Sequence, residues 1–270
     1  MGIRMIGSII GDIIGSIWEG KQSKTKDVEL FNEYSTFTDD TVLTLAVVEA
    51  ILEKRGYQSE IIRYYKKYPH AGYGHMFKDW ANSSKPQPYK SYGNGSAMRV
   101  SPIAYAFDDL KTVLKEAGKS AEITHNSPDG IAGAQAIALS ILMARKGSSK
   151  AEIRSQISKR FRFNIADGVE ELRKYNIENW IVNGTSVEES VPVALLCFLD
   201  SDSFEDTIRN ALYLGGDTDT IASMAGGIAQ AFYQKIPEWI LAESRNRLEE
   251  AQLDIIDRFN NKYGIDYLEP

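Results

Sequence analysis

The sequence predicts an all-α protein, a single domain that covers residues 1–270. Apolar residues recur at the spacing of amphipathic helices along most of the chain. No stretch shows the alternation of apolar and polar residues, bounded by turn residues, that is typical of a strand. No linker or low-complexity tract divides the chain, and 270 residues is within the range of one large domain.

Three glycines mark the first predicted helix, residues 4–18. Gly7, Gly11 and Gly15 recur every fourth residue and therefore lie on one helix face. A helical glycine costs up to about 1 kcal/mol relative to alanine, so this stripe indicates close packing of another helix or a backbone kept near a ligand. Asp12 lies within the glycine face, where a charge is unexpected. Glu19 is seven residues further on and is expected on the same face, unless it is a solvated helix-end residue.

The next two predicted helices are 40–54, which ends near Gly56, and 58–67. Residues 69–96 are rich in Pro, Gly, Ser and Tyr, and are expected to form a long, ordered, irregular segment. The sequence predicts further helices at 99–107, 109–122, 128–146, 149–158, 168–175, 188–200, 204–213, 219–234 and 237–261.

Composition argues against several classes of protein. The net charge is −6 with acidic and basic residues well mixed, and no basic stripe predicts nucleic-acid binding. The apolar start of the chain is broken by Asp12, is too short to span a bilayer and has no cleavage-site pattern. The single cysteine, Cys197, excludes a disulfide within the chain and a cysteine-built zinc site. We expect a cytoplasmic monomer without membrane contact.

Two acidic clusters share one design. The letters TDDT (38–41) and DTDT (217–220) each stand at the start of a predicted apolar helix. Helix capping explains one residue of each cluster, but each cluster supplies four oxygen-bearing side chains. Crowded carboxylates repel one another unless a cation neutralises them, and hard divalent cations take several oxygen ligands. If the two helix starts meet, their four aspartates make a site for one or two Mg²⁺ or Mn²⁺ ions.

Two further segments are candidates for ligand binding. Gly93, Asn94 and Gly95 precede a predicted helix, where backbone N–H groups can bind phosphate, although Asn-Gly is also a turn signal. His125, in THNSPDG, could bind a phosphate or a base edge, or could be satisfied by the backbone.

Read in order, the motifs resemble those of the ADP-ribosylglycohydrolase family. They are GSIIGDIIGSIWEG, FTDDTVLTLAV, SYGNGSAMRVSPIA, THNSPDGIAGAQAIA, ESVPVAL and FEDTIRNALYLGGDTDTIASMAGGIAQAFY, and they run nearly the whole chain. The resemblance implies the all-α fold of that family, which is a single-domain orthogonal helical bundle, and a binuclear Mg²⁺ or Mn²⁺ centre. One departure is Ser127, where many bacterial members have a histidine; contacts to substrate there are expected to differ.

The resemblance also implies roles for individual residues. The implied metal ligands are Thr38, Asp39, Asp40, Asp217, Asp219 and Thr220, with Asp219 bridging the two ions. The implied substrate-binding residues are Ser91, Tyr92, Gly93, Asn94 and Gly95, around the diphosphate and ribose, and His125, near the phosphates or the adenosine. As general acid or base we expect Glu19 first, because it is the acid least needed to balance the metal charge, and then Asp39 or Asp217.

The activity implied is hydrolysis of the glycosidic bond between ADP-ribose and an acceptor, which is a protein side chain or a small molecule. One alternative is a non-catalytic ADP-ribose-binding or structural relative, although the intact acidic clusters argue against it. Another is a different all-α Mg²⁺ enzyme that acts on diphosphates, but DDTVL lacks the last acid of a DDxxD motif. The aromatic segment 64–92 is expected either to select the acceptor or simply to pack.

Overall fold

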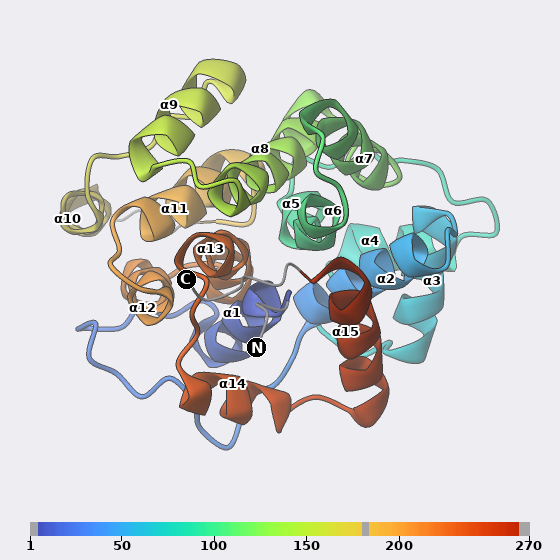
Figure 1. The fold of residues 1–270 in the computed structure, drawn as a ribbon, viewed down its shortest axis with the longest axis horizontal. Helices are drawn as coiled ribbons and strands as arrows, with labels where there is room; N and C mark the ends of the chain where they lie inside the picture. The colour runs from blue at the N-terminus through green and yellow to red at the C-terminus, as the bar shows by residue number, and fades with distance from the viewer. Residues whose placement is uncertain (1–4, 180–183, 265–270) are drawn as a thin grey trace.

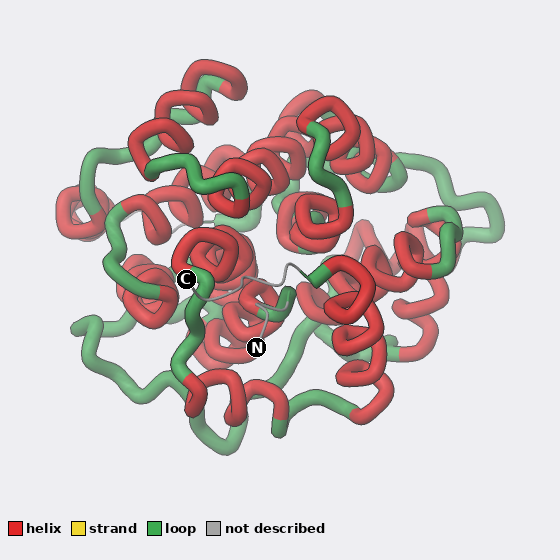
Figure 2. Tube along the Cα trace, viewed as in Figure 1, coloured by secondary structure: helices red, strands yellow, loops and turns green. Residues whose placement is uncertain are grey.

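The computed structural model describes residues 5–179 and 184–264, and every regular element within these two ranges is a helix. Figure 2 shows these helices joined by loops, and the described residues contain no strand, only an isolated bridge between Gly93 and Ser186. The all-α prediction is therefore confirmed. The helices are α1 (Gly7–Gly15), α2 (Asp39–Leu52), α3 (Tyr57–Lys67), α4 (His75–Asn82), α5 (Gly95–Met98), α6 (Ser101–Ala106), α7 (Leu110–Glu122), α8 (Pro128–Arg145), α9 (Lys150–Phe161), α10 (Val169–Asn179), α11 (Val187–Leu199), α12 (Phe204–Leu214), α13 (Thr218–Tyr233), α14 (Glu238–Arg245) and α15 (Glu250–Tyr263).

Helices α1 and α13 form the centre of the bundle (Figure 1), and α2, α8, α11, α12 and α14 pack around them. Every residue of α1 is buried, as is α13 from Thr218 to Ala231. An entirely buried helix needs apolar or small residues on all sides, and both sequences supply them. The first and last thirds of the chain thus meet in the core.

The glycine stripe of α1 lies against α13. A Cβ atom on Gly11 would lie 2.1 Å from the carbonyl oxygen of Ala222, and one on Gly15 would lie 2.5 Å from the Cα of Asp219. Gly7 is equally close to the far end of α13. Because no side chain separates the two backbones, the end of α1 reaches the first turn of α13.

Two predicted boundaries differ from the structure. The single helix expected at 237–261 is two helices, since Glu249 and Gln252 form a capping box that begins α15. The segment 69–96, expected to be irregular, contains α4 and the start of α5. Helix α4 is short and amphipathic, with Phe77 and Trp80 turned into the core. Aromatic packing stabilises it where glycine and proline obscure the helical pattern.

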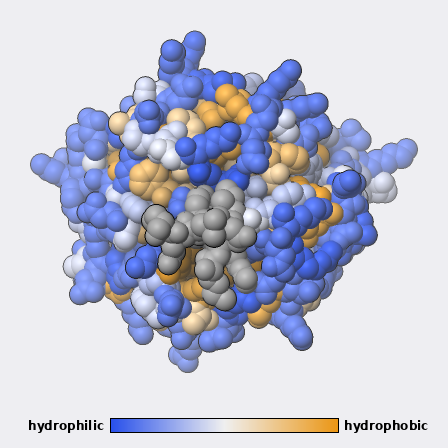
Figure 3. Space-filling model, in the orientation of Figure 1, coloured by the Kyte–Doolittle hydropathy of each residue, from blue (hydrophilic) through white to orange (hydrophobic). Residues whose placement is uncertain are grey.

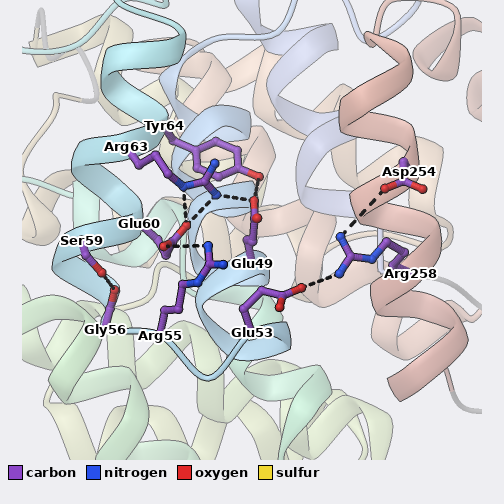
Figure 4. Close-up of polar contacts among 10 residues, drawn as sticks. All are labelled: Glu49, Glu53, Arg55, Gly56, Ser59, Glu60, Arg63, Tyr64, Asp254 and Arg258. Carbon is purple, nitrogen blue, oxygen red and sulfur yellow. Dashed lines mark hydrogen bonds and ion pairs between the residues drawn. The ribbon is translucent and has the colours of Figure 1, made fainter.

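Ion pairs tie the outer helices α2, α3 and α15 together (Figure 4). Arg63 of α3 pairs with Glu49 of α2 and, at 2.6 Å, with Glu60 of its own helix. Arg258 of α15 pairs with Glu53 at the end of α2. Both arginines are partly exposed, so each pair contributes at most about 1 kcal/mol. The pairs orient these helices, while the core supplies most of the stability.

The surface in Figure 3 is mostly hydrophilic, with hydrophobic side chains in small separate groups. Among the described residues, no helix combines the length and the apolar character needed to cross a bilayer.

Candidate metal centre and adjoining cavity

Carboxylates from α1, α2 and α13 converge where the starts of α2 and α13 meet. Asp12, Asp40 and Asp219 form one group, and Glu19, Asp217 and Asp219 form a second. Within each group one oxygen of every residue lies within 4.8 Å of the others. Asp219 belongs to both groups, which is the arrangement a residue bridging two cations needs. The structure therefore confirms that the two acidic helix starts lie next to each other.

Asp217 stands at the N-cap position of α13 but does not act as a cap. Its side chain makes no capping hydrogen bond to the backbone of the helix, and its Oδ2 instead accepts a hydrogen bond from Asn94 Nδ2 at 2.6 Å. Asn94 also donates to Ser190 Oγ at 3.2 Å, so the amide is held between two helices. The carboxylate is thereby turned away from the helix end and toward the other acids.

Glu19 lies at the centre, but it follows the first helix instead of sharing a face of that helix with Asp12. Helix α1 ends at Gly15, and a 3-10 turn over Ser16–Trp18 places Glu19 beyond the helix, on an exposed edge. The expectation that it shares a helix face with Asp12 is therefore wrong. The backbone N–H of Gly20 donates to the carbonyl of Gly216 at 2.9 Å. This contact ties the Glu19 segment to the start of α13.

Gly215 and Gly216, which precede α13, make the hydrogen bond between Gly20 and Gly216 possible. Their φ angles are +69° and +100°, in the left-handed region that favours glycine. A Cβ atom on Gly215 would also lie 2.5 Å from the carbonyl oxygen of Lys21. The glycine pair thus allows the Glu19 segment to approach the second acidic cluster.

Asp12 belongs to the centre although it is not among the site residues predicted from the sequence. Its Oδ2 accepts hydrogen bonds from the backbone N–H groups of Thr38 and Thr41, at 2.9 and 3.0 Å. The two threonine hydroxyls also donate to its carboxylate. With both oxygens engaged, Asp12 anchors the first turn of α2 to α1. The signal for this role was a charge on an otherwise apolar glycine face.

The carboxylates of the centre are buried close together, and this perturbs their ionisation. Burial, and next the charge of Asp12, raise the pKa of Asp39 to about 7. Burial raises the pKa of Asp40 and of Asp219 well above the usual range, and the charges of Asp12 and Asp217, respectively, raise it further. Burial also raises the pKa of Asp217, against the hydrogen bond from Asn94. A cation bound among these carboxylates would offset their mutual repulsion and favour their charged forms.

Asp40 provides a test of whether a cation fits here. Its Oδ2 accepts a hydrogen bond from Thr220 Oγ1 at 3.0 Å, but its buried Oδ1 has no partner among the described residues. A buried carboxylate oxygen without a hydrogen bond is costly, and hard cations take oxygen ligands. The donor set therefore fits Mg²⁺ or Mn²⁺.

A cavity of about 440 Å³ opens over these carboxylates. Its lining includes the predicted site residues Glu19, Thr38, Asp39, Asp40, Ser91, Gly93, Asn94, Gly95, His125, Asp217, Asp219 and Thr220. Tyr92 is placed differently: the residue is 60% exposed and does not line the cavity, and its carbonyl accepts a hydrogen bond from the N–H of Val187. Its role in substrate binding stays a prediction.

His125 is buried beside the glycine-rich loop. Its Nδ1 lies 2.7 Å from Thr124 Oγ1, and a Cβ atom on Gly95 would lie 3.1 Å from the ring. Burial, and then the charge of Arg99, lower its pKa well below the usual value, so the imidazole is neutral. Ser127 does not occupy the cavity: it caps α8.

Several residues of the cavity wall are not among the predicted site residues. Arg99 lines it although the side chain is fully buried, and nothing in the sequence distinguishes it from a surface arginine. Helix α4 contributes His75, Met76 and Phe77. Of the aromatic residues in segment 64–92, only Phe77 and Tyr89 line the cavity, whereas others, such as Tyr64, Tyr65, Tyr73 and Trp80, are buried in the core.

The chain is similar in sequence and in fold to proteins described as ADP-ribosyl hydrolases or glycohydrolases. The sequence profile of a family described as ADP-ribosylglycohydrolase matches residues 4–264. The chain is 30% identical to ADP-ribosylhydrolase ARH3 of Mus musculus over 87% of this chain and 84% of that protein. It is 23% identical to ADP-ribosylarginine hydrolase Tri1 of Pseudomonas putida, over 87% of this chain and 72% of that one. A solved structure titled ADP-ribosylglycohydrolase-related protein complex superposes with a TM-score of 0.72 and 21% identity, covering 96% of this chain and 95% of the other.

Proposed function

This chain belongs to the ADP-ribosylglycohydrolase family, and on that premise we propose that it is a metal-dependent hydrolase of ADP-ribose conjugates. The bond cleaved is the N- or O-glycosidic bond between the anomeric carbon of ADP-ribose and an acceptor, a protein side chain or a small molecule. The observation that carries the proposal is the pair of carboxylate clusters that share Asp219, whose members other than Asp12 line the cavity. The names of the ARH3 and Tri1 relatives support the same substrate class.

Two Mg²⁺ or Mn²⁺ ions are the proposed cofactors, with Thr38, Asp39, Asp40, Asp217, Asp219 and Thr220 as their candidate ligands. When bound, these ions supply Lewis acidity toward the hydroxyl oxygens of the ribose. Asp219 is proposed to bridge the two ions because, among the described residues, it alone belongs to both clusters of carboxylates. Asp12 is assigned a different task, which is to hold Thr38 and Thr41 in place.

The remaining residues of the cavity orient the substrate. Gly93 and Gly95 leave room for a ligand close to the backbone, and Asn94 holds Asp217 in position. Fixing the ribose in this way positions the anomeric carbon for attack. Glu19 is the proposed general acid or base, because it lines the cavity on an exposed edge where it can exchange protons with solvent.

The test is incubation of the protein with Mg²⁺ or Mn²⁺ and a panel of conjugates, namely ADP-ribosyl-arginine, ADP-ribosyl-serine and O-acetyl-ADP-ribose. Free ADP-ribose is measured by chromatography. Release from at least one conjugate that is abolished by EDTA and by Asp219→Asn is the expected result. Binding of ADP-ribose without release from any conjugate would identify a non-catalytic relative instead.

A further inference from the structure

Arg99, Thr124 and His125 form a chain of buried contacts that ends at the cavity. The Nη2 of Arg99 donates to Thr124 Oγ1 and to the carbonyl oxygen of Ser120, both at 2.9 Å. Thr124 Oγ1 lies 2.7 Å from His125 Nδ1. Arg99 and Thr124 are completely inaccessible to solvent, and His125 is 4% exposed. Water therefore does not compete for these contacts.

The direction of each hydrogen bond follows from the chemistry of the groups. A guanidinium has donors only, so Thr124 Oγ1 accepts from Arg99. The single hydroxyl hydrogen of Thr124 then needs an acceptor, and among the described residues the structure offers it only His125 Nδ1. If Nδ1 carried a proton, the hydroxyl hydrogen would be buried without a partner, which is unfavourable. Nδ1 is therefore the acceptor, and the proton of the neutral ring is on Nε2.

The opposite side of the ring faces the glycine-rich loop. Cβ atoms on Gly95 and Gly93 would lie 3.2 and 3.7 Å from Nε2, so the absence of side chains leaves the space before this nitrogen open. Both glycines and His125 line the cavity, and no protein group among the described residues hydrogen-bonds to Nε2. Burial, and then the charge of the Arg99 guanidinium, lower the pKa of His125 and so disfavour a second proton on the ring.

We propose that Arg99 and Thr124 are positioning residues that hold His125 as a neutral imidazole with its proton on Nε2, so that the cavity presents a hydrogen-bond donor to an oxygen of the substrate. The proposal rests on the proposed function, under which that oxygen belongs to the ribose–diphosphate portion of ADP-ribose. The ring then discriminates between ligands: Nε2–H donates to a ligand oxygen that accepts a hydrogen bond, and a ligand group that can only donate is disfavoured there.

The tautomer is measured directly by ¹⁵N NMR of protein labelled at histidine. The chain has three histidines, and the other two, His70 and His75, are exposed, so His70→Gln and His75→Gln variants assign the spectrum. The expected wild-type spectrum shows His125 with a protonated Nε2 and an unprotonated Nδ1 from pH 6 to 8. A His125 protonated on Nδ1 would overturn the proposal without reference to any activity.

The matched variants are Thr124→Val, which removes the hydroxyl but keeps the shape, and Thr124→Ser, which keeps the hydroxyl. Thr124→Val is expected to mix the two tautomers and to weaken ADP-ribose binding, measured by calorimetry with Mg²⁺, by about tenfold. Thr124→Ser is expected to restore the wild-type tautomer and to bind within about twofold of wild type. Arg99→Met frees Oγ1 to accept from the ring, so an Nδ1-protonated form is expected to appear.

Thermal denaturation verifies that each variant is folded before its spectrum is interpreted. Retention of both the tautomer and the affinity in folded Thr124→Val would overturn the positioning role. If the wild type showed the expected tautomer but did not bind ADP-ribose, the proposed function would fail while the assignment of the proton to Nε2 would stand.

Discussion

Replacing Gly11 by alanine tests the contact that brings α1 against α13. The new Cβ atom would lie 2.1 Å from the Ala222 carbonyl oxygen and 2.7 Å from the Ser223 nitrogen, whereas ordinary van der Waals contact begins at 3.4 Å. Both obstacles are backbone atoms of a buried helix, so they cannot yield by a side-chain rotation. The two helices must therefore separate.

The magnitude follows from two opposing terms. Alanine is the better helix former by about 1 kcal/mol, which favours the variant. Overpacking a core costs about 1–3 kcal/mol, and a backbone clash puts Gly11→Ala at or above the upper end of that range. The expected net loss is about 2 kcal/mol, which lowers the melting temperature of a chain of this size by about 4–8 °C. Because the separation moves Asp12 and Glu19 away from Asp219, Mg²⁺ affinity is also expected to fall.

Gly227→Ala is the matched control, since Gly227 lies in the same pair of buried helices. A Cβ atom there would meet only side-chain atoms at 3.5 Å or more. Gly227→Ala is expected to be neutral or to stabilise by up to about 1 kcal/mol. Thermal denaturation of both variants, with and without Mg²⁺, is the assay. Equal melting temperatures for Gly11→Ala and Gly227→Ala would refute the reasoning that the glycine stripe sets the helix distance.

Three further predictions concern the centre itself. Glu19→Gln is expected to bind Mn²⁺ with near wild-type affinity and to lose hydrolysis by at least about 100-fold, as measured by calorimetry and ADP-ribose release. Asn94→Ala removes a hydrogen bond to Asp217 and is expected to weaken metal binding by about tenfold or more, as is typical of residues that orient a ligand. In protein stripped of divalent cations, the melting temperature is expected to fall as pH rises from about 4, the ordinary pKa of an aspartate, to beyond the pKa of about 7 that burial and Asp12 give to Asp39. The folded state binds more protons than the unfolded state in that window, so each rise in pH favours unfolding, and added Mg²⁺ is expected to stabilise most above pH 7.

Each of these predictions has a distinct contrary outcome. Wild-type turnover in Glu19→Gln would remove Glu19 from its role as acid or base. Unchanged metal affinity in Asn94→Ala would mean that Asp217 is not oriented by the amide. A stripped protein that became more stable from pH 4 to 7 would show that the buried carboxylates are charged without a cation.

Much of this molecule follows from local pattern alone. The spacing of apolar residues predicts the helices, because an amphipathic or buried helix needs that period whatever it packs against. The stripe Gly7, Gly11 and Gly15 predicts a close backbone contact, and the two acidic clusters predict a cation site, since both arguments rest on chemistry within a few residues. The apolar pattern does not predict the break between α14 and α15, because the apolar period continues across the capping box of Glu249 and Gln252.

The partners of these features depend on the tertiary structure. That Gly11 meets Ala222, that Asp12 holds α2 by its threonines, and that a buried Arg99 stands behind His125 are contacts between residues 25 to more than 200 positions apart. A sequence shows which groups are able to bind a cation, a backbone or a substrate. Which of them meet is decided by the packing of the whole bundle, because only the core brings distant helix ends to one place and excludes the water that would otherwise satisfy their charges.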